Sequence, residues 1–267
     1  MKRLFIGAFF LALTIILGTS LKAEDRKFAG QAVPLDRPEV AEGVDQELLL
    51  LSEAKSRVWL TLRRSAKYLP IIDTALSKTG VSADFRYLPM TLTSLSPTYQ
   101  VGGRAGLWRL SANEAKAMGL VISRELDERL DPVAASLASA TKIKNLEKSL
   151  GSPVMALAAF IDENATRAAM AAAANETNYF RLYCPESLEK AVFQVLAGQI
   201  LFSAPQVYGY NLTKTWPNLA KKRQKVTAPQ DLRALASQNN LDHKSFRDLN
   251  PHILGETIPV GAFVYLP

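Results

Sequence analysis

The chain is poor in the residues that build redox and metal chemistry: its 267 residues include one cysteine and two histidines. Cys184 alone cannot form an intrachain disulfide, so we expect it to be a small buried residue in a chain stabilised by its core. His243 and His252 stand in no HExxH or CxxC setting, and their positions near turns indicate that both are surface residues. The glycine-rich VGGRAG lacks the Lys-Ser/Thr of a phosphate loop. The sequence therefore predicts no metal, no cofactor and no nucleotide chemistry.

A second absence is local. The stretch from Tyr87 to Pro97, YLPMTLTSLSP, contains no charged side chain. It therefore holds no carboxylate that could act as a general acid, since proton transfer needs a titratable group within hydrogen-bond reach.

The first 23 residues have the pattern of a secretory signal peptide. Lys2 and Arg3 precede an apolar run from Leu4 to Leu17, and Ala23 is a small residue suited to cleavage. An uncleaved membrane anchor is the alternative, although the run is shorter than the roughly 20 residues of a spanning helix. No cysteine lies near the cleavage point, which argues against a lipoprotein. We expect an exported, periplasmic protein with no transmembrane segment after cleavage.

The formal net charge is a mild basic surplus of +7. Removing residues 1–23 takes away three of the 32 basic residues and none of the 25 acidic ones, which leaves +4. Such a surplus fits an environment of acidic polymers or lipid and does not suggest nucleic-acid binding.

Helical signals dominate the chain up to about residue 210, and period-two strand patterns are absent there. Residues 24–56 are interpreted as an N-terminal arm, extended to about Gly43, followed by a short helix. Ser111 and Glu114 form a capping box, and Pro70 suits the first turn of a new helix. The predicted helices are Asp45–Lys55, Arg57–Leu69, Ile71–Thr79, Ala83–Thr93, Asn113–Met118, Asp131 to about Leu150, Pro153–Ala159, Thr166–Ala174 and Pro185–Phe202.

The composition changes after residue 216. Residues 217–224 are interpreted as a basic linker. Its Lys221, Lys222 and Arg223 form a cluster with Lys225, the first residue after it, and this cluster is either solvated or in contact with an anionic polymer or lipid. Residues 225–267 read as a strand, two short helices and a closing strand, which suits a small accessory domain.

Several segments between Arg57 and Tyr210 resemble lytic transglycosylases of the membrane-bound type D branch. They are RSAKYLPIIDTALSKTGVSADFRYLPM, AGLWRLSANEAKAMGL, DERLDPVAASLASATKIKNL, SPVMALAAF and SAPQVYGY, in the family's order. The resemblance implies a mainly α fold, with a lysozyme-like (SLT) helical domain over residues 57–216. It also implies peptidoglycan glycan strands as the partner.

The same resemblance implies that the catalytic group is missing. Family members use one glutamate, first as acid and then as base, and Leu92 stands at its position with Thr93 after it. A leucine cannot transfer a proton. The family's motif residues are also replaced elsewhere: Arg109 stands for a glutamine, Ile161, Asp162 and Glu163 for N-A-G, and Lys190 or Ala191 for a tyrosine.

A surviving groove would be lined by residues near this position. The candidates for glycan contact are Tyr87, Leu92, Tyr99, Trp108 and Arg109, and for Trp108 a core position is the favoured interpretation. If the chain is active, Asp162 or Glu163 would supply a relocated acid.

The C-terminal segment resembles a LysM domain, which implies a small βααβ module that binds N-acetylglucosamine glycans. FRDLNPHI and IPVGAFVYLP carry this resemblance, while the family's G-D-T-L is replaced by PQDL. The implied glycan-contact residues are Asp231, Leu232, Asn250, Pro251 and His252.

The sequence thus predicts an exported, catalytically inactive transglycosylase homologue that binds peptidoglycan or scaffolds another cell-wall enzyme or envelope complex. Two alternatives stay open: an active lytic transglycosylase with a relocated acid, and a protein-protein interaction module that binds no glycan.

Overall fold

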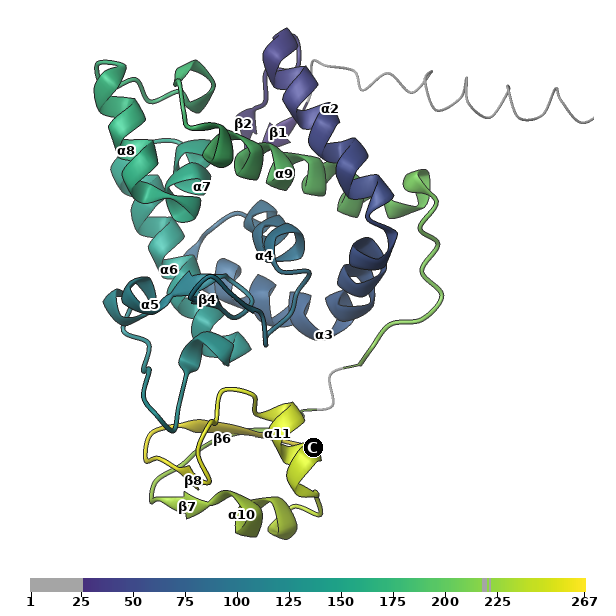
Figure 1. Cartoon of the computed structure of the whole chain (residues 1–267), viewed down its shortest axis with the longest axis vertical. Helices are drawn as coiled ribbons and strands as arrows, with labels where there is room; N and C mark the ends of the chain where they lie inside the picture. Colours follow the sequence, from purple (N-terminus) through teal and green to yellow (C-terminus); the bar gives the residue numbers. More distant parts are fainter. Residues whose placement is uncertain (1–25, 218–219, 221) are drawn as a thin grey trace, which may run out of the picture.

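The computed structural model describes residues 26–217, 220 and 222–267, so the predicted signal peptide lies outside the described residues. The protein is mainly helical, as expected. Figure 1 shows a helical body that holds most of the chain and, at one end of it, the C-terminal residues. The helices of the body are α2 (Pro38–Glu53), α3 (Lys55–Thr79), α4 (Tyr87–Leu92), α5 (Ala112–Ala117), α6 (Pro132–Leu150), α7 (Pro153–Ile161), α8 (Glu163–Ala172) and α9 (Glu186–Ser203).

Short 3₁₀ turns and two-residue strands join these helices. The turns are η2 (Ala83–Arg86), η3 (Glu128–Leu130), η4 (Tyr179–Arg181) and η5 (Pro205–Tyr208). The strands are β1 (Lys27–Phe28), β2 (Gln31–Ala32), β3 (Gln100–Val101), β4 (Arg104–Ala105) and β5 (Leu110–Ser111). β3, β4 and β5 form one antiparallel sheet, so the expectation of no strands in this part was wrong. The alternation of apolar and polar residues that indicates a strand cannot be recognised in strands of only two residues.

The centre of the body is α7, whose sequence is apolar on every side. Ser152 caps it by accepting a hydrogen bond from the Met155 amide (3.2 Å), and Pro153 occupies its first turn. Its residues from Val154 to Ala159 are fully buried, and its alanines let α6, α8 and α9 approach closely. α7 is therefore the centre of the hydrophobic core, and α6, α8 and α9 pack around it.

Helix α3 runs unbroken past Pro70, although the sequence predicted two helices there. An internal proline costs about 3 kcal/mol, because it removes a backbone hydrogen bond and crowds the preceding turn. Both halves of α3 bury apolar residues in the same core: Val58 and Leu62 before Pro70, Ile72 and Leu76 after it. Burial of one continuous face outweighs the local penalty.

The N-terminal arm is more ordered than predicted. β1 and β2 form a hairpin, turning through Ala29 and Gly30 at positive φ, and Phe28 is fully buried against the edge of Phe85 (5.2 Å between ring centroids). The Ala29 amide donates to Asp84 Oδ2 at 2.7 Å, and α2 begins at Pro38. One buried aromatic thus anchors a segment that has no periodic pattern.

The C-terminal part has its own apolar cluster, built on residues such as Leu232, Phe246 and Val264. Its helices are α10 (Leu232–Gln238) and α11 (His243–Leu249), and its strands are β6 (Lys222–Lys225), β7 (Gln230–Asp231), β8 (Thr257–Ile258) and β9 (Phe263–Leu266). β6 pairs antiparallel with β9, and β7 with β8. Lys222 and Arg223 of the predicted basic linker therefore lie in a strand, together with Lys225.

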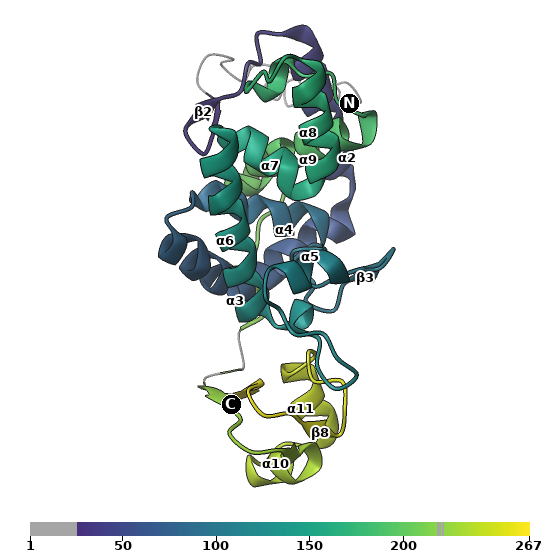
Figure 2. The same cartoon turned by 90° about the vertical axis from the view of Figure 1, so that its left-hand side faces the viewer.

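A network around Asp131 joins the helical body to the C-terminal part at the N-terminal end of α6. Figure 2 shows the C-terminal part beneath the body. Asp131 is 1% exposed and caps α6 by accepting from the amides of Val133 (2.8 Å) and Ala134 (3.1 Å). The same carboxylate accepts a hydrogen bond from the Tyr265 hydroxyl and lies 3.5 Å from Arg223 Nη2. Burial, and secondly the charge of Asp131, raise the pKa of Tyr265.

Backbone contacts extend this junction. Leu126 and Ile253 form an antiparallel bridge, the Asp127 amide donates to His252 O (2.9 Å), and the Leu254 amide donates to Glu125 O (2.7 Å). Leu126 is itself part of the C-terminal apolar cluster. The two parts are therefore joined by a shared core as well as by the chain.

A buried acid lies between α2 and α9, and it gives a prediction. Glu47 is 8% exposed, and burial raises its pKa despite the opposing charges of Lys190 and Arg57. A raised pKa in the folded state means that ionised Glu47 costs stability at neutral pH, and that this cost disappears below the pKa of the unfolded chain. We expect Glu47→Gln to raise the melting temperature at pH 7, with a difference that shrinks to zero as the pH falls below about 4.5. Thermal melts of both proteins between pH 4 and pH 8 measure this; a constant difference across that range would contradict it.

Candidate functional site

Leu92, the position at which the sequence resemblance leads us to expect a glutamate, is the last residue of α4 and packs partly buried against the main core. Thr91 and Thr93 on either side of it are buried, and the Thr93 hydroxyl lies 2.8 Å from Leu107 O. Thr91 contacts α9 so closely that a Cβ on Gly198 would come within 2.0 Å of its methyl group. The end of α4 is therefore packed between α9 and the loop that joins β4 to β5, and no residue of α4 is acidic.

The turn after α4 is strained. Ser94 and Leu95 have φ values of 52° and 53°, a left-handed conformation that costs a residue with a Cβ roughly 1 kcal/mol or more. Leu95 is fully buried, and Arg64 Nη1 donates to Ser94 O at 2.9 Å. Arg57 likewise donates to Thr91 O. Two arginines of α3 thus hold the backbone on either side of Leu92.

The predicted groove residues differ in accessibility. Tyr87, Tyr99 and Arg109 are half-buried, as is Leu92. Trp108 is 2% exposed, its indole N–H donates to Ser136 Oγ (2.9 Å), and its ring packs edge-on to Phe160. Of its two readings, the core reading fits this environment, because a ring with no free face cannot stack on a sugar.

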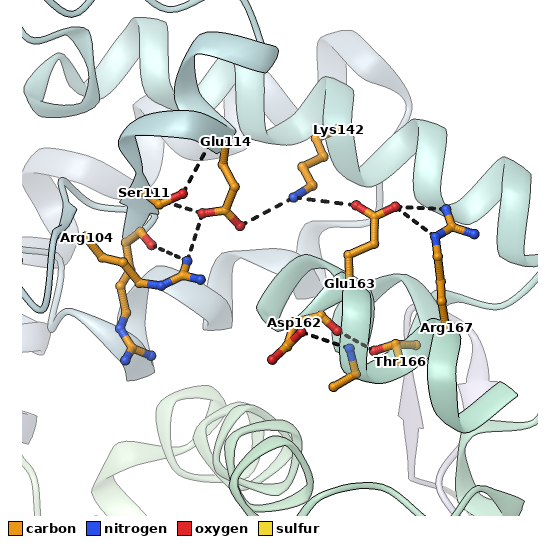
Figure 3. Close-up of polar contacts among 10 residues, drawn as sticks. Arg104, Ser111, Glu114, Lys142, Asp162, Glu163, Thr166 and Arg167 are labelled. Carbon is orange, nitrogen blue, oxygen red and sulfur yellow. Dashed lines mark hydrogen bonds and ion pairs between the residues drawn. The ribbon is translucent and has the colours of Figure 1, made fainter. Parts of the chain in front are cut away.

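Asp162 and Glu163 stand at the junction of α7 and α8, and Figure 3 shows both. Asp162 is exposed and caps α8, accepting from the Ala165 amide at 3.0 Å. Glu163 pairs with Arg167 (2.8 Å) and lies 4.0 Å from Lys142. Asp162 therefore has a structural role as a helix cap, and Glu163 has one as a member of ion pairs.

Lys142 bridges two carboxylates across α6 (Figure 3). Its amine lies 3.7 Å from Glu114 and 4.0 Å from Glu163, so it links α5 to α8. The predicted capping box is confirmed: Glu114 accepts from the Ser111 amide (2.9 Å), and Ser111 Oγ accepts from the Glu114 amide (3.3 Å). Burial alone would raise the pKa of Glu114, but the hydrogen bonds with Ser111 and the charge of Arg104 outweigh it and lower that pKa.

The C-terminal candidates are mostly interior, which corrects the expectation that they form a contact surface. Leu232 and Asn250 are fully buried and His252 is 1% exposed. The Asn250 amide bonds to Tyr265 through both its oxygen (2.6 Å) and its nitrogen (3.0 Å). His252 Nε2 lies 2.7 Å from Phe263 O, so this histidine is not the surface residue that its turn position indicated. Only Asp231, the exposed N-cap of α10, and half-buried Pro251 stay within reach of a ligand.

Cys184, the lone cysteine, is buried as expected, and burial raises the pKa of its thiol. Within residues 26–217, 220 and 222–267, no cluster of three or more histidine, cysteine or acidic side chains could hold a metal ion. In the same residues, no helix is long and apolar enough to cross a membrane.

Comparison with known proteins finds two distant relatives. The chain is 22% identical over 209 residues to the membrane-bound lytic murein transglycosylase D of Escherichia coli K12, and equally to that of Escherichia coli O6:H1. The match covers 76% of this chain and 46% of each relative, so the chain spans about half the length of the curated relatives it matches. No family model matches the chain. The chain is thus distantly similar to lytic murein transglycosylases over three quarters of its own length.

Proposed function

We propose that this protein is an exported, catalytically inactive homologue of lytic transglycosylases that binds peptidoglycan in the periplasm. The observation that carries the proposal is Leu92 at the end of α4, where the resemblance calls for a glutamate. Glycosidic cleavage needs a carboxyl group beside the scissile oxygen to protonate the leaving group. Leu92 offers only an apolar side chain, and Thr93 after it already has its hydroxyl at a main-chain carbonyl.

The alternative of a relocated acid requires Asp162 or Glu163 to act in catalysis. Their surroundings favour structural roles, because Asp162 is exposed and caps a helix while Glu163 lies between two cations. An acid in a glycosidase is instead held in an apolar setting that keeps it protonated.

The homology supports peptidoglycan as the ligand, and a scaffold without its acid can still bind a glycan. The likeness to a LysM domain adds a second proposed contact with the same polymer. With Leu232, Asn250 and His252 buried, we propose that any contact made by this part involves Asp231 and its surroundings.

The test incubates the mature protein with purified sacculi, then assays pelleting and released muropeptides by mass spectrometry. We expect pelleting, with anhydro and reducing ends no higher than in a buffer control. An active lytic transglycosylase serves as the positive control for product release.

Each other outcome identifies an alternative. Product release that is lost in Asp162→Asn or Glu163→Gln would establish the relocated acid and overturn catalytic inactivity. Absence of both pelleting and products would favour a protein-protein interaction module, in which case the partner is another envelope protein.

A further inference from the structure

A long groove runs along the outer face of α6, away from the residues that the resemblance assigns to glycan contact. It has a volume of about 1070 Å³, with α5 and α8 beside it and with Arg223 and Phe263 of the C-terminal part at one end. α6 lines it from Val133 to Ser149, a span of about 24 Å at 1.5 Å per residue. None of Tyr87, Leu92, Tyr99, Trp108 and Arg109 lines it. A groove of this length suits an extended polymer better than a small metabolite.

The edges of the groove are fixed in place. Lys142 links Glu114 of α5 to Glu163 of α8 across α6, as Figure 3 shows, and Arg167 holds Glu163 from the next turn of α8. The far end is fixed by the Arg223–Asp131 pair. A binding surface held in this way loses little conformational entropy when it is occupied.

The charges of the groove are balanced. Its acidic residues are Glu114, Glu128 and Glu163, and its basic residues are Lys142, Arg167 and Arg223. Every one of these carboxylates has a partner, since Glu128 accepts from the Val121 amide at 2.7 Å and the other two are ion-paired. Polyanions such as nucleic acids bind surfaces with a net excess of cations. The balance here favours a ligand without net charge on its backbone.

The floor combines apolar surface with an available amide. Leu137 is 47% exposed among alanines of α6, and the Phe263 ring is stacked against the Arg223 guanidinium at 3.4 Å. Asn145 is exposed and its side-chain amide makes no hydrogen bond within the part of the chain that the structure describes. A sugar ring presents an apolar C–H face together with polar edges, and an acetamido group needs both a donor and an acceptor, which an asparagine amide supplies.

We propose that this groove binds a neutral glycan strand of N-acetylhexosamines, with Leu137 beneath a sugar ring, Asn145 bonded to an acetamido group and the stacked Arg223–Phe263 pair at one end of the strand. The inference rests on the proposed function and relocates glycan binding from the end of α4 to the outer face of α6. Because Arg223 and Phe263 belong to the C-terminal part, the intact junction at Asp131 is part of the site.

The experiment titrates the full mature chain with a soluble pentamer of N-acetylglucosamine, using calorimetry and methyl NMR, and repeats the sacculus pelleting. The test variant is Leu137→Gln/Asn145→Ala. The matched control is Leu50→Gln/Asn164→Ala, which changes an exposed leucine of α2 and an exposed asparagine of α8, neither of which lines the groove. We expect the test variant to bind the pentamer about tenfold more weakly, as loss of one hydrogen bond and one apolar contact implies, with the control unchanged.

The outcomes separate this inference from the proposed function. If the wild type pellets with sacculi but the test variant binds as well as the control, the groove is not the site and peptidoglycan binding stands. If methyl shifts fall around Leu88 and Leu95 instead of Leu137 and Met118, the α4 region is the site and the inference is overturned. If the wild type binds neither probe, both proposals are wrong; a peptide or protein that shifts Leu137 instead would identify the groove as a protein-binding surface.

Discussion

Replacing Asp131 with alanine is expected to lower the free energy of unfolding by about 2–4 kcal/mol, the combined cost of a lost helix cap and a broken buried interaction. Asp131 is 1% exposed and accepts hydrogen bonds from two amides at the start of α6. The substitution also leaves the Tyr265 hydroxyl without its acceptor and Arg223 without its carboxylate. Urea denaturation of both proteins, followed by circular dichroism, measures the difference.

Asp242 supplies the matched control for this prediction. It caps α11 in the same way, accepting from the Ser245 amide at 2.8 Å, but it is exposed and has no partner in the helical body among the residues described. Asp242→Ala should therefore cost only the cap, about 1 kcal/mol. In a double-mutant cycle, Asp131→Ala and Tyr265→Phe should be non-additive, since they share one hydrogen bond. Equal losses for Asp131→Ala and Asp242→Ala would mean that Asp131 does not join the two parts.

The local role of Asp131 could be predicted from the sequence, but its long-range role could not. An aspartate before a proline marks a helix start, and α6 does begin at Pro132. Tyr265 lies 134 positions away, and no spacing rule connects the two. Capping signals are read over a few residues, whereas tertiary contacts depend on how complete elements pack.

The same limit explains the predictions that were wrong. Pro70 is a helix breaker in its local sequence, yet α3 continues because residues on both sides of it reach one core. His252 is polar and follows a proline near a turn, yet it is buried because β9 supplies a carbonyl for its ring. In both cases tertiary packing outweighed a correctly identified local signal.

The sequence was sufficient to identify the residue at the candidate site, but not to predict which residues line the groove on α6. The sequence identifies Leu92 and shows that it carries no acid. It does not reveal that α6 residues at helical spacing line a groove with Arg223 and Phe263, because those two come from a strand pair that begins some 70 residues further along the chain. From the sequence alone, a basic cluster between two domains is predicted to be a solvated linker. The structure shows that Lys222, Arg223 and Lys225 of this cluster lie in β6.

Replacing Gly106 with alanine is expected to cost more than about 4 kcal/mol, a loss large enough to unfold a protein of ordinary stability. A Cβ at this position would lie 1.8 Å from the carbonyl oxygen of Arg129, which is backbone and cannot rotate away. The glycine also has φ +77°, where a side chain is strained even in open space. Soluble yield and urea denaturation of Gly106→Ala measure the effect.

Gly102→Ala separates the steric contact from the backbone strain. Gly102 belongs to the same glycine-rich segment and has φ +59°, but a Cβ there would meet nothing within 4 Å. It should cost only about 1 kcal/mol, the penalty of the left-handed conformation. Equal stability of the two variants would show that the Gly106–Arg129 approach is not tight. The expected difference gives Gly106 a structural role: it sets the distance between the β3–β5 sheet and the turn that leads to Asp131, whatever residue stands at position 92.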